Sequence, residues 1–409
     1  MGNSNEISKK IEELLPHDSK LTKVEFEGPD VVIYLGNIGA FYSDENLIRK
    51  IAGTLRKRVL VRSDPSALSP PDDALKKITQ IIPEDAGVKE VRFSPEFCEV
   101  VIESLKPGLV IGKGGATLKE IILQTGWAPK ILRTPTMPSE TIKGIRSSLL
   151  READNRKKFL NILGKKICLG GNGSKCEWLK VTALGGFREV GRSCMLVQTN
   201  NNKVLIDCGV NAETTDPPRA FPYLSAMNLA LDELDAVIVT HAHLDHSGFI
   251  PYLYAYGYDG PVYCTTPTRD LMAMLQFDYL EVVNKNGNGT APYSDKHIRH
   301  MLNRCVVREY EEVTDITPEI KLTFHNAGHI LGSAMVHLHI GEGMHNLVYS
   351  GDIKYGFTRL YDPADTTFPR VETLFIESTY GGRADMMPPR QDIENKLNNI
   401  LLETLRKKG

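Results

Sequence analysis

The 409-residue chain lacks any hydrophobic run long enough to cross a bilayer, and its first ten residues lack the apolar core of a secretion signal. Its seven cysteines include no Cys-x-x-Cys pair, and the spacing between Cys168 and Cys176 matches no usual zinc pattern. We therefore interpret the cysteines as reduced, mostly packing residues. Together these absences predict a cytoplasmic protein without a membrane partner.

The net charge of −2 conceals an asymmetry along the chain. Residues 1–170 contain 27 Lys/Arg and 22 Asp/Glu, and the remainder therefore contains 22 and 29. Most of the basic excess lies in residues 142–170. Such a run is either a solvated helical face or a contact with a phosphate backbone. The length predicts roughly two to four domains.

Four potential metal ligands occupy six consecutive positions: His241, His243, Asp245 and His246, spaced by Ala242 and Leu244. The apolar run 236–239 reads as a buried strand, so the ligands fall on the loop at its end. Neutral imidazole and carboxylate suit zinc, and the Asp-His pair offers ligands to a second ion. Scattered loop histidines are the alternative, but this density makes a two-metal hydrolytic centre the better interpretation.

Three later or earlier residues are candidates to complete the centre. His329 lies between Gly328 and Gly332, and Asp352 ends the strand-like run 346–352. Asp207 also ends an apolar strand and could orient a ligand histidine through its second nitrogen. Ordinary turn chemistry is the competing interpretation of each residue alone.

The front of the chain repeats a pattern of helix, two strands, helix and strand at an interval of about 70 residues, which predicts two small α+β modules. In the second module, Gly112-Lys113-Gly114-Gly115 leads into a helical run. This loop resembles the Gly-x-x-Gly loop of a KH domain, which clamps the backbone of about four single-stranded nucleotides. A plain tight turn is the alternative.

The first module carries Ser43-Asp44-Glu45-Asn46 where the second carries its glycine loop. Acidic residues there would repel phosphate. We therefore interpret the first module as a degenerate KH fold used for packing or dimer geometry, with an auxiliary RNA surface as the alternative.

The ligand pattern resembles the metallo-β-lactamase superfamily. The resemblance implies that His241, His243 and His329 hold one zinc ion, that Asp245 and His246 hold another, and that Asp352 bridges the two. The superfamily contains lactamases, thioesterases, oxidases and nucleases, so the fold alone does not settle the function.

Two further segments, 185–193 and 375–381, resemble the archaeal cleavage and polyadenylation specificity factor-like ribonucleases of the β-CASP group. The second segment contains Glu377, which the resemblance places with Asp245 and His246 among the catalytic residues. It implies a zinc-dependent endoribonuclease acting on single-stranded RNA, with 5′ to 3′ exonuclease action as a further expectation. The same resemblance suggests a role in transcript 3′-end formation, transcription termination or RNA decay. It also suggests RNA polymerase or the ribosome as partners and a homodimer as the assembly.

The chain departs from that family after Glu377. The family places a cap domain there and returns to the metal core with a last histidine ligand, whereas this sequence contains no histidine after His345. We therefore expect a fragment that ends at the first helix of the cap, with an incomplete second zinc site and reduced activity.

The predicted fold class is α+β, with two KH-like modules followed by an αββα metallo-β-lactamase sandwich. The predicted boundaries are a degenerate KH-like module at 1–67, a KH domain at 68–141, a basic linker at 142–175, the metal domain at 176–384 and the cap helix at 385–409. Two other functions stay open: RNA binding without catalysis, and hydrolysis of a small molecule.

Overall fold

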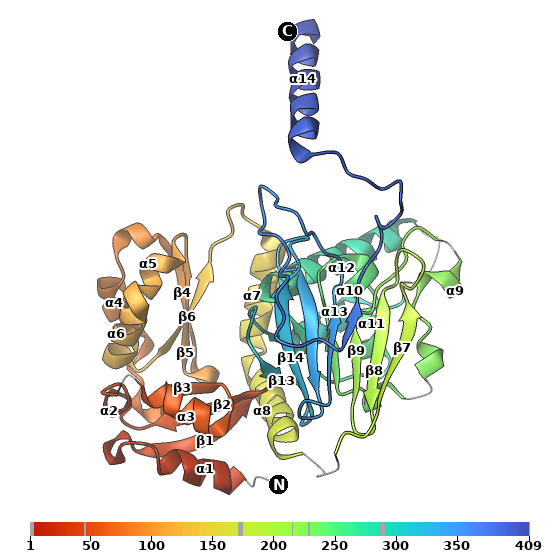
Figure 1. Ribbon diagram of the computed structural model, residues 1–409. Helices are drawn as coiled ribbons and strands as arrows, with labels where there is room; N and C mark the ends of the chain where they lie inside the picture. Colours follow the sequence, from red (N-terminus) through yellow and green to blue (C-terminus); the bar gives the residue numbers. More distant parts are fainter. Residues whose placement is uncertain are drawn as a thin grey trace. The chain divides into compact units, whose positions relative to one another are not determined.

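The computed structural model describes residues 4–44, 46–170, 175–214, 216–227, 230–286 and 291–408. Glu45 and residues 171–174, which belong to the predicted acidic loop and the predicted linker, lie outside this part of the chain. The chain divides into two compact units, Met1–Phe375 and Ile376–Gly409. The boundary at Phe375 comes before the predicted end of the metal domain at 384. Each unit is described by itself (Figure 1).

The first module contains a three-stranded sheet and helices on one side of it. Strands β1 and β2 are antiparallel and β3 runs parallel to β2. Its core includes Ile11, Phe26, Ile33 and Ile51, all of them fully buried or nearly so. The elements in chain order are α1 (Ser4–Glu12), β1 (Leu21–Glu27), β2 (Asp30–Leu35), α2 (Ile38–Phe41), α3 (Leu47–Leu55) and β3 (Val59–Ser63).

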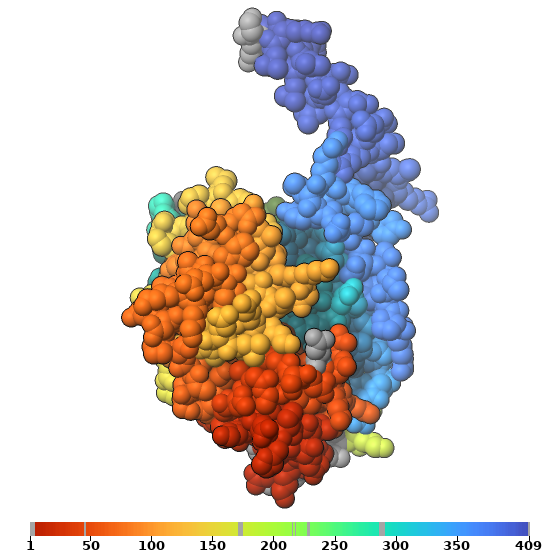
Figure 2. Space-filling model, turned by 90° about the vertical axis from the view of Figure 1, so that its left-hand side faces the viewer, coloured from red at the N-terminus to blue at the C-terminus, as the bar shows by residue number. Residues whose placement is uncertain are grey.

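The second module repeats this order and these strand directions, so the predicted duplication is present in the structure. Each predicted single helix after the second strand is instead two helices with a loop between them. In the second module the reason is backbone geometry, because Gly112, Gly114 and Gly115 all have positive φ and interrupt the helix. Its elements are α4 (Pro71–Ile81), β4 (Val88–Ser94), β5 (Glu99–Ser104), α5 (Pro107–Ile111), α6 (Ala116–Thr125) and β6 (Ala128–Arg133). Figure 2 shows the first module in red and the second in orange.

The described part of the predicted basic linker consists of two helices, α7 (Glu140–Arg151) and α8 (Ala153–Leu169). Helix α8 packs on β1 and buries Leu160 and Leu163. The Arg156 side chain is half-buried, and its guanidinium donates to the backbone oxygens of Asn303 and Cys305. Part of the basic run therefore holds the first unit together, whereas Lys143, Lys158 and Lys166 keep more than half of their side chains exposed.

The rest of the first unit is a sandwich of two sheets. The first sheet has the order β12-β11-β10-β9-β8-β7, with β9 to β12 parallel. Its strands are β7 (Leu179–Gly185), β8 (Cys194–Thr199), β9 (Lys203–Ile206), β10 (Ala236–Ile238), β11 (Val262–Cys264) and β12 (Cys305–Val307). The second sheet contains β13 (Thr314–Asp315), β14 (Ile320–Asn326), β15 (Ala334–Ile340), β16 (His345–Tyr349) and β17 (Thr373–Phe375) in that order.

Alternation along the strands builds two apolar layers. Met195 and Val197 face the second sheet, while Leu196 between them faces the helices on the other side. Those helices are α11 (Ile250–Ala255), α12 (Thr266–Asn286) and α13 (Asp295–Arg304) (Figure 1). The outer face of the second sheet carries a further small apolar cluster. There Phe368 packs with Met335.

Charged pairs attach the first module to the sandwich. Arg308, which follows β12, donates to both carboxylate oxygens of Asp30 at 3.0 and 3.2 Å, and both side chains are at most 9% exposed. Lys57 pairs with Asp315 at 2.6 Å on the same junction. A buried pair of this kind requires both partners, because either charge alone would be costly.

The second unit contains α14 (Arg390–Lys408), which begins close to the predicted start at Pro388. The helix carries apolar residues at helical spacing, as the sequence predicts: Ile393, Leu397, Ile400 and Leu401.

Among the described helices, none combines the length and the apolar character needed to cross a membrane. The seven cysteines are free thiols, and five of them are buried.

The packing of α8 on the first module generates a stability prediction. A Cβ at Gly164 would lie 2.3 Å from the Phe26 Cβ and 2.4 Å from the Gly28 backbone oxygen. We expect Gly164→Ala to lower the thermal midpoint of unfolding, because overpacking of about 1–3 kcal/mol exceeds the gain of about 1 kcal/mol in helix propensity. Scanning calorimetry of both proteins measures the difference.

Gly144→Ala on α7 is the matched control, because a Cβ there meets nothing within 4 Å. It should leave the midpoint unchanged or raise it. An equal rise for both substitutions would contradict the close approach of α8 to β1.

Candidate metal centre

The His241–His246 segment lies after β10. It consists of a loop followed by most of the short helix α10 (Leu244–Ser247). His243 precedes the helix, and its backbone oxygen accepts from the His246 N–H at 3.0 Å. This turn places the His246 ring beside that of His241, with 4.2 Å between the ring centres. Gly209 lies against the turn so closely that a Cβ there would be 1.7 Å from the Asp245 backbone oxygen, so the position requires glycine.

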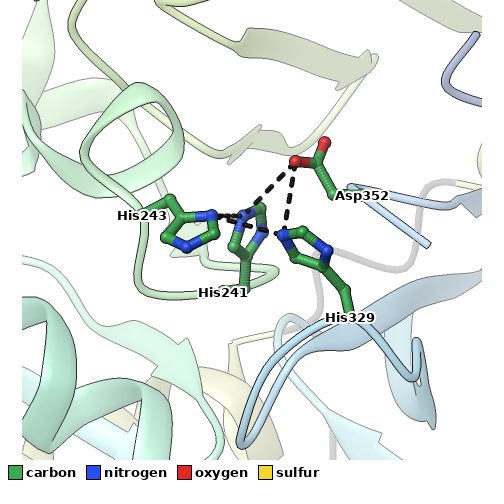
Figure 3. A group of neighbouring side chains, drawn as sticks. All are labelled: His241, His243, His329 and Asp352. Carbon is green, nitrogen blue, oxygen red and sulfur yellow. Dashed lines mark hydrogen bonds and ion pairs between the residues drawn. The ribbon is translucent and has the colours of Figure 1, made fainter. Parts of the chain in front are cut away.

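Four side chains converge from two sheets to form the first ligand group (Figure 3). The His243 Nδ1 lies 3.1 Å from the His241 Nε2 and 3.3 Å from the His329 Nε2. The Asp352 Oδ2 lies 3.7 Å from the His241 Nε2 and 3.6 Å from the His329 Nε2. The loop after β10 supplies two of these residues, and the loops after β14 and β16 supply the others.

The spacing of these atoms fits a tetrahedral zinc ion. Zinc–nitrogen bonds of about 2.0–2.1 Å imply roughly 3.3–3.4 Å between ligand atoms of a tetrahedron. The observed separations of 3.1 to 3.7 Å bracket that value. Two imidazole nitrogens that both lack a proton are acceptors and cannot form a hydrogen bond with each other. A cation between them would bind the lone pairs of both.

A second group contains Asp245, His246 and Asp352. The His246 Nε2 lies 3.8 Å from an Asp245 oxygen and 3.3 Å from the Asp352 Oδ1. Asp352 thus directs Oδ2 towards the first group and Oδ1 towards the second. A carboxylate placed in this way can bridge two ions.

Burial and nearby charge set the protonation of the centre. Burial lowers the pKa of the His241 imidazole well below its usual range, and the neighbouring histidines add to the effect. Burial would also lower the pKa of His246, but the carboxylates of Asp207 and Asp352 more than offset it and raise the value to about 10. The second group therefore attracts positive charge, which a metal ion can supply in place of the proton.

Asp207 lies behind the ligands and is fully buried. Its Oδ2 lies 2.7 Å from the His246 Nδ1, so it can orient that ring. Sequence reasoning missed two hydroxyl groups nearby: Thr240 Oγ1, which donates to Asp207 at 2.8 Å, and Ser193 Oγ, 3.4 Å from the His246 Nε2. Neither belongs to a metal-ligand pattern. The signal that could have identified Thr240 is its position directly before the first ligand.

The predicted RNA loop connects α5 and α6. Lys113 and Gly114 are exposed, and the positive φ of Gly112, Gly114 and Gly115 turns the chain sharply before α6 begins at Ala116. A Cβ at Gly112 would lie 2.3 Å from the Thr117 Oγ1, whereas one at Gly114 would meet nothing within 4 Å. The loop thus offers an open backbone surface next to a helix N-terminus.

The first module uses the corresponding region for packing within the chain. Ile122 of α6 is buried in the core of the first module, and the Lys119 ammonium lies 5.7 Å from the centre of the Tyr42 ring. Helix α6 of the second module therefore packs against the first module beside Tyr42.

Glu377 belongs to the second unit, where its carboxylate accepts from the Thr379 N–H at 2.9 Å. Its assignment as a catalytic residue stays a prediction.

Comparisons with known proteins follow the same division of the chain. The KH domain of transcription termination factor FttA matches residues 2–68, a KH domain matches 75–126, and the metallo-β-lactamase superfamily matches 188–389. The chain therefore consists of KH domains followed by a metallo-β-lactamase superfamily domain.

Its curated relatives include archaeal proteins named transcription termination factor FttA. The protein of Methanothermobacter thermautotrophicus is 52% identical over 404 residues, which cover 99% of this chain and 63% of the relative. The protein of Methanocaldococcus jannaschii is 50% identical and covers 98% of this chain, again with 63% of its own length. The chain thus spans 63% of the length of these relatives. Among solved structures, a metallo-β-lactamase from Cronobacter sakazakii aligns with a TM-score of 0.29 and 20% identity, over 41% of this chain and 60% of its own.

The geometry of the first group predicts that His241→Ala strips zinc from the protein. The substitution removes the fully buried imidazole whose Nε2 lies 3.1 Å from the His243 Nδ1 and 3.7 Å from an Asp352 oxygen. Elemental analysis of purified wild-type and variant proteins measures the change as zinc per chain.

His325→Ala is a suitable control, because His325 is buried on the second sheet outside both ligand groups. It should retain the wild-type zinc content. Unchanged zinc in His241→Ala, or none in the wild type, would contradict the assignment.

Proposed function

We propose that this chain is the KH and metal-binding part of a zinc-dependent ribonuclease that cleaves single-stranded RNA. The observation that carries the proposal is the pair of ligand groups joined by Asp352, in one unit with an exposed glycine loop of KH type. The activity would be endonucleolytic, with 5′ to 3′ exonuclease action as an addition. A role in transcription termination is supported by the name that the relatives carry, and transcript 3′-end formation and RNA decay are related roles that we propose as alternatives.

The ligand groups suit phosphodiester hydrolysis. When bound, a pair of zinc ions lowers the pKa of water and stabilises the negative charge that develops on phosphate oxygens. The protein would hold the first ion with His241, His243, His329 and Asp352. It would hold the second with Asp245, His246 and the other oxygen of Asp352. A nucleophilic side chain is not needed in such a centre.

The remaining partners and conditions are also proposals. RNA polymerase or the ribosome, a homodimer and a cytoplasmic location accord with a termination factor. Residues that the relatives have beyond this match would supply the last ligand and the proton donor. The presence of two ligand groups disfavours a protein that binds RNA without catalysis. The KH domains disfavour a small-molecule hydrolase, because such an enzyme does not need to hold a nucleic-acid backbone.

The exposed glycine loop predicts that Gly114→Asp weakens binding of single-stranded RNA. A carboxylate would enter a surface that must contact phosphate. A Cβ at Gly114 meets nothing within 4 Å, and aspartate is among the side chains that adopt the positive φ of this position, so the fold should be kept. We expect the dissociation constant for a short fluorescent RNA to rise about tenfold, which corresponds to roughly 1.4 kcal/mol. Fluorescence anisotropy at one fixed salt concentration measures it.

Gly114→Asn is the matched control, because asparagine has nearly the same size, carries no charge and tolerates positive φ. It should bind RNA more tightly than Gly114→Asp. Equal affinity of all three proteins would return the loop to the status of a plain turn.

The metal assignment predicts that Asp245→Ala abolishes RNA cleavage without affecting KH-dependent binding. The test uses the chain extended by the residues that its relatives possess, because the ligand and acid named above are expected there. Cleavage of end-labelled RNA should fall at least about 100-fold. The RNA dissociation constant should stay within about twofold, since ligand loop and glycine loop lie on different domains.

Undiminished cleavage by Asp245→Ala would exclude the second ligand group from the reaction. Strong, Asp245-dependent cleavage by the 409 residues alone would show that the centre needs nothing further.

A further inference from the structure

We propose that Thr240, which belongs to neither ligand group, is the positioning residue that couples them. Its hydroxyl would fix the ring and the protonated nitrogen of His241 directly, and those of His246 through Asp207. The inference rests on the proposed metal-dependent function and concerns how this chain prepares its own ligands.

The first half of the coupling is a contact with the first ligand group. Thr240 Oγ1 lies 3.0 Å from the His241 Nδ1, whereas the His241 Nε2 faces His243 and Asp352. If Nε2 is the ligand atom, Nδ1 must carry the hydrogen. The Nδ1–H then donates to Thr240 Oγ1, and this hydrogen bond holds the ring in the ligating orientation.

The second half runs through Asp207. The Thr240 hydroxyl donates to the Asp207 Oδ2 at 2.8 Å, and its backbone N–H donates to the Oδ1 at 2.8 Å. The same Oδ2 accepts from the His246 Nδ1 at 2.7 Å. With Nδ1 as the donor, the His246 Nε2 is the nitrogen directed at the second ligand group, where a metal ion would take the place of its hydrogen. One hydroxyl therefore lies between ligands of both groups.

The hydrogen bonds have one consistent direction. His241 donates to Thr240, Thr240 donates to Asp207, and His246 donates to the same carboxylate. An oxygen that both accepts and donates is required at the middle position, and a hydroxyl is the side-chain group that does so there. Valine, which has nearly the same shape, would leave the His241 N–H and one Asp207 lone pair without their partner.

The surrounding backbone is built to hold Thr240 in this place. Thr240 is 1% exposed, and its backbone oxygen accepts from the Ala334 N–H at 2.8 Å, which ties it to β15 of the second sheet. A Cβ at Gly351 would lie 2.8 Å from the Thr240 Cβ, so that position requires glycine, which its φ of 52° also favours. Gly351 immediately precedes the shared ligand Asp352. Thr240 thus contacts segments of both sheets: Asp207 after β9, Ala334 of β15 and Gly351 after β16.

The test compares zinc affinities of folded proteins. Thr240→Val should raise the dissociation constants of both zinc ions about 10- to 100-fold, the usual effect of losing an outer hydrogen bond to a ligand. Thr240→Ser keeps the hydroxyl and should stay within about threefold of the wild type. Competition with a chromophoric chelator gives the constants, and circular dichroism verifies folding.

Thr323→Val is the matched control. Thr323 is also a buried threonine whose hydroxyl lies near a histidine nitrogen, at 3.1 Å from His339, but it lies outside both ligand groups. Its zinc affinities should equal those of the wild type. If Thr240→Val does not fold, Asp207→Asn tests the same connection and should weaken both ions as well.

The outcomes separate this inference from the proposed function. A wild-type protein that binds no zinc would overturn the proposed function. Zinc-binding wild type with equally tight Thr240→Val would overturn the coupling alone. So would a Thr240→Ser protein as weak as Thr240→Val, because the methyl group and not the hydroxyl would then be responsible.

Discussion

The Asp352 carboxylate is the residue at which ligands from the two sheets of the sandwich meet. Its two oxygens face different ligand groups, and those groups come mainly from the loop after β10 on the opposite sheet. The apolar layer between the sheets, which includes Met195 and Phe324, keeps the strand ends in register so that the loops can meet. The centre therefore depends on sheet-to-sheet packing as much as on the ligands themselves.

Much of the candidate site could be predicted from the sequence because the pattern is local. Four ligands within His241–His246 leave few other interpretations, and one strand followed by one loop places them. His329 and Asp352 carry weak signals alone, yet their order after the first cluster was sufficient for the prediction. The duplication of the front modules was likewise visible, because each module repeats its strand pattern within about 70 residues.

The remaining features depend on partners that are distant in sequence. Lys157 pairs with Glu25 at 3.2 Å, and Arg156 bonds to Cys305, so no local pattern could separate these cations from those that face solvent. Thr240 was missed for a related reason. A threonine at a strand end is common, and its importance follows from the Asp207 carboxylate that reaches it from a neighbouring strand.

The buried pair of Arg308 and Asp30 makes the first module part of the architecture of the sandwich. Residues 1–67 are therefore not a separate domain on a linker that could be removed without effect on the sandwich. Their removal would take Asp30 away from the Arg308 guanidinium after β12 and leave that cation with Glu312, 3.6 Å away, as its acidic partner. Any module that replaced residues 1–67 would therefore have to present a carboxylate at the place of Asp30.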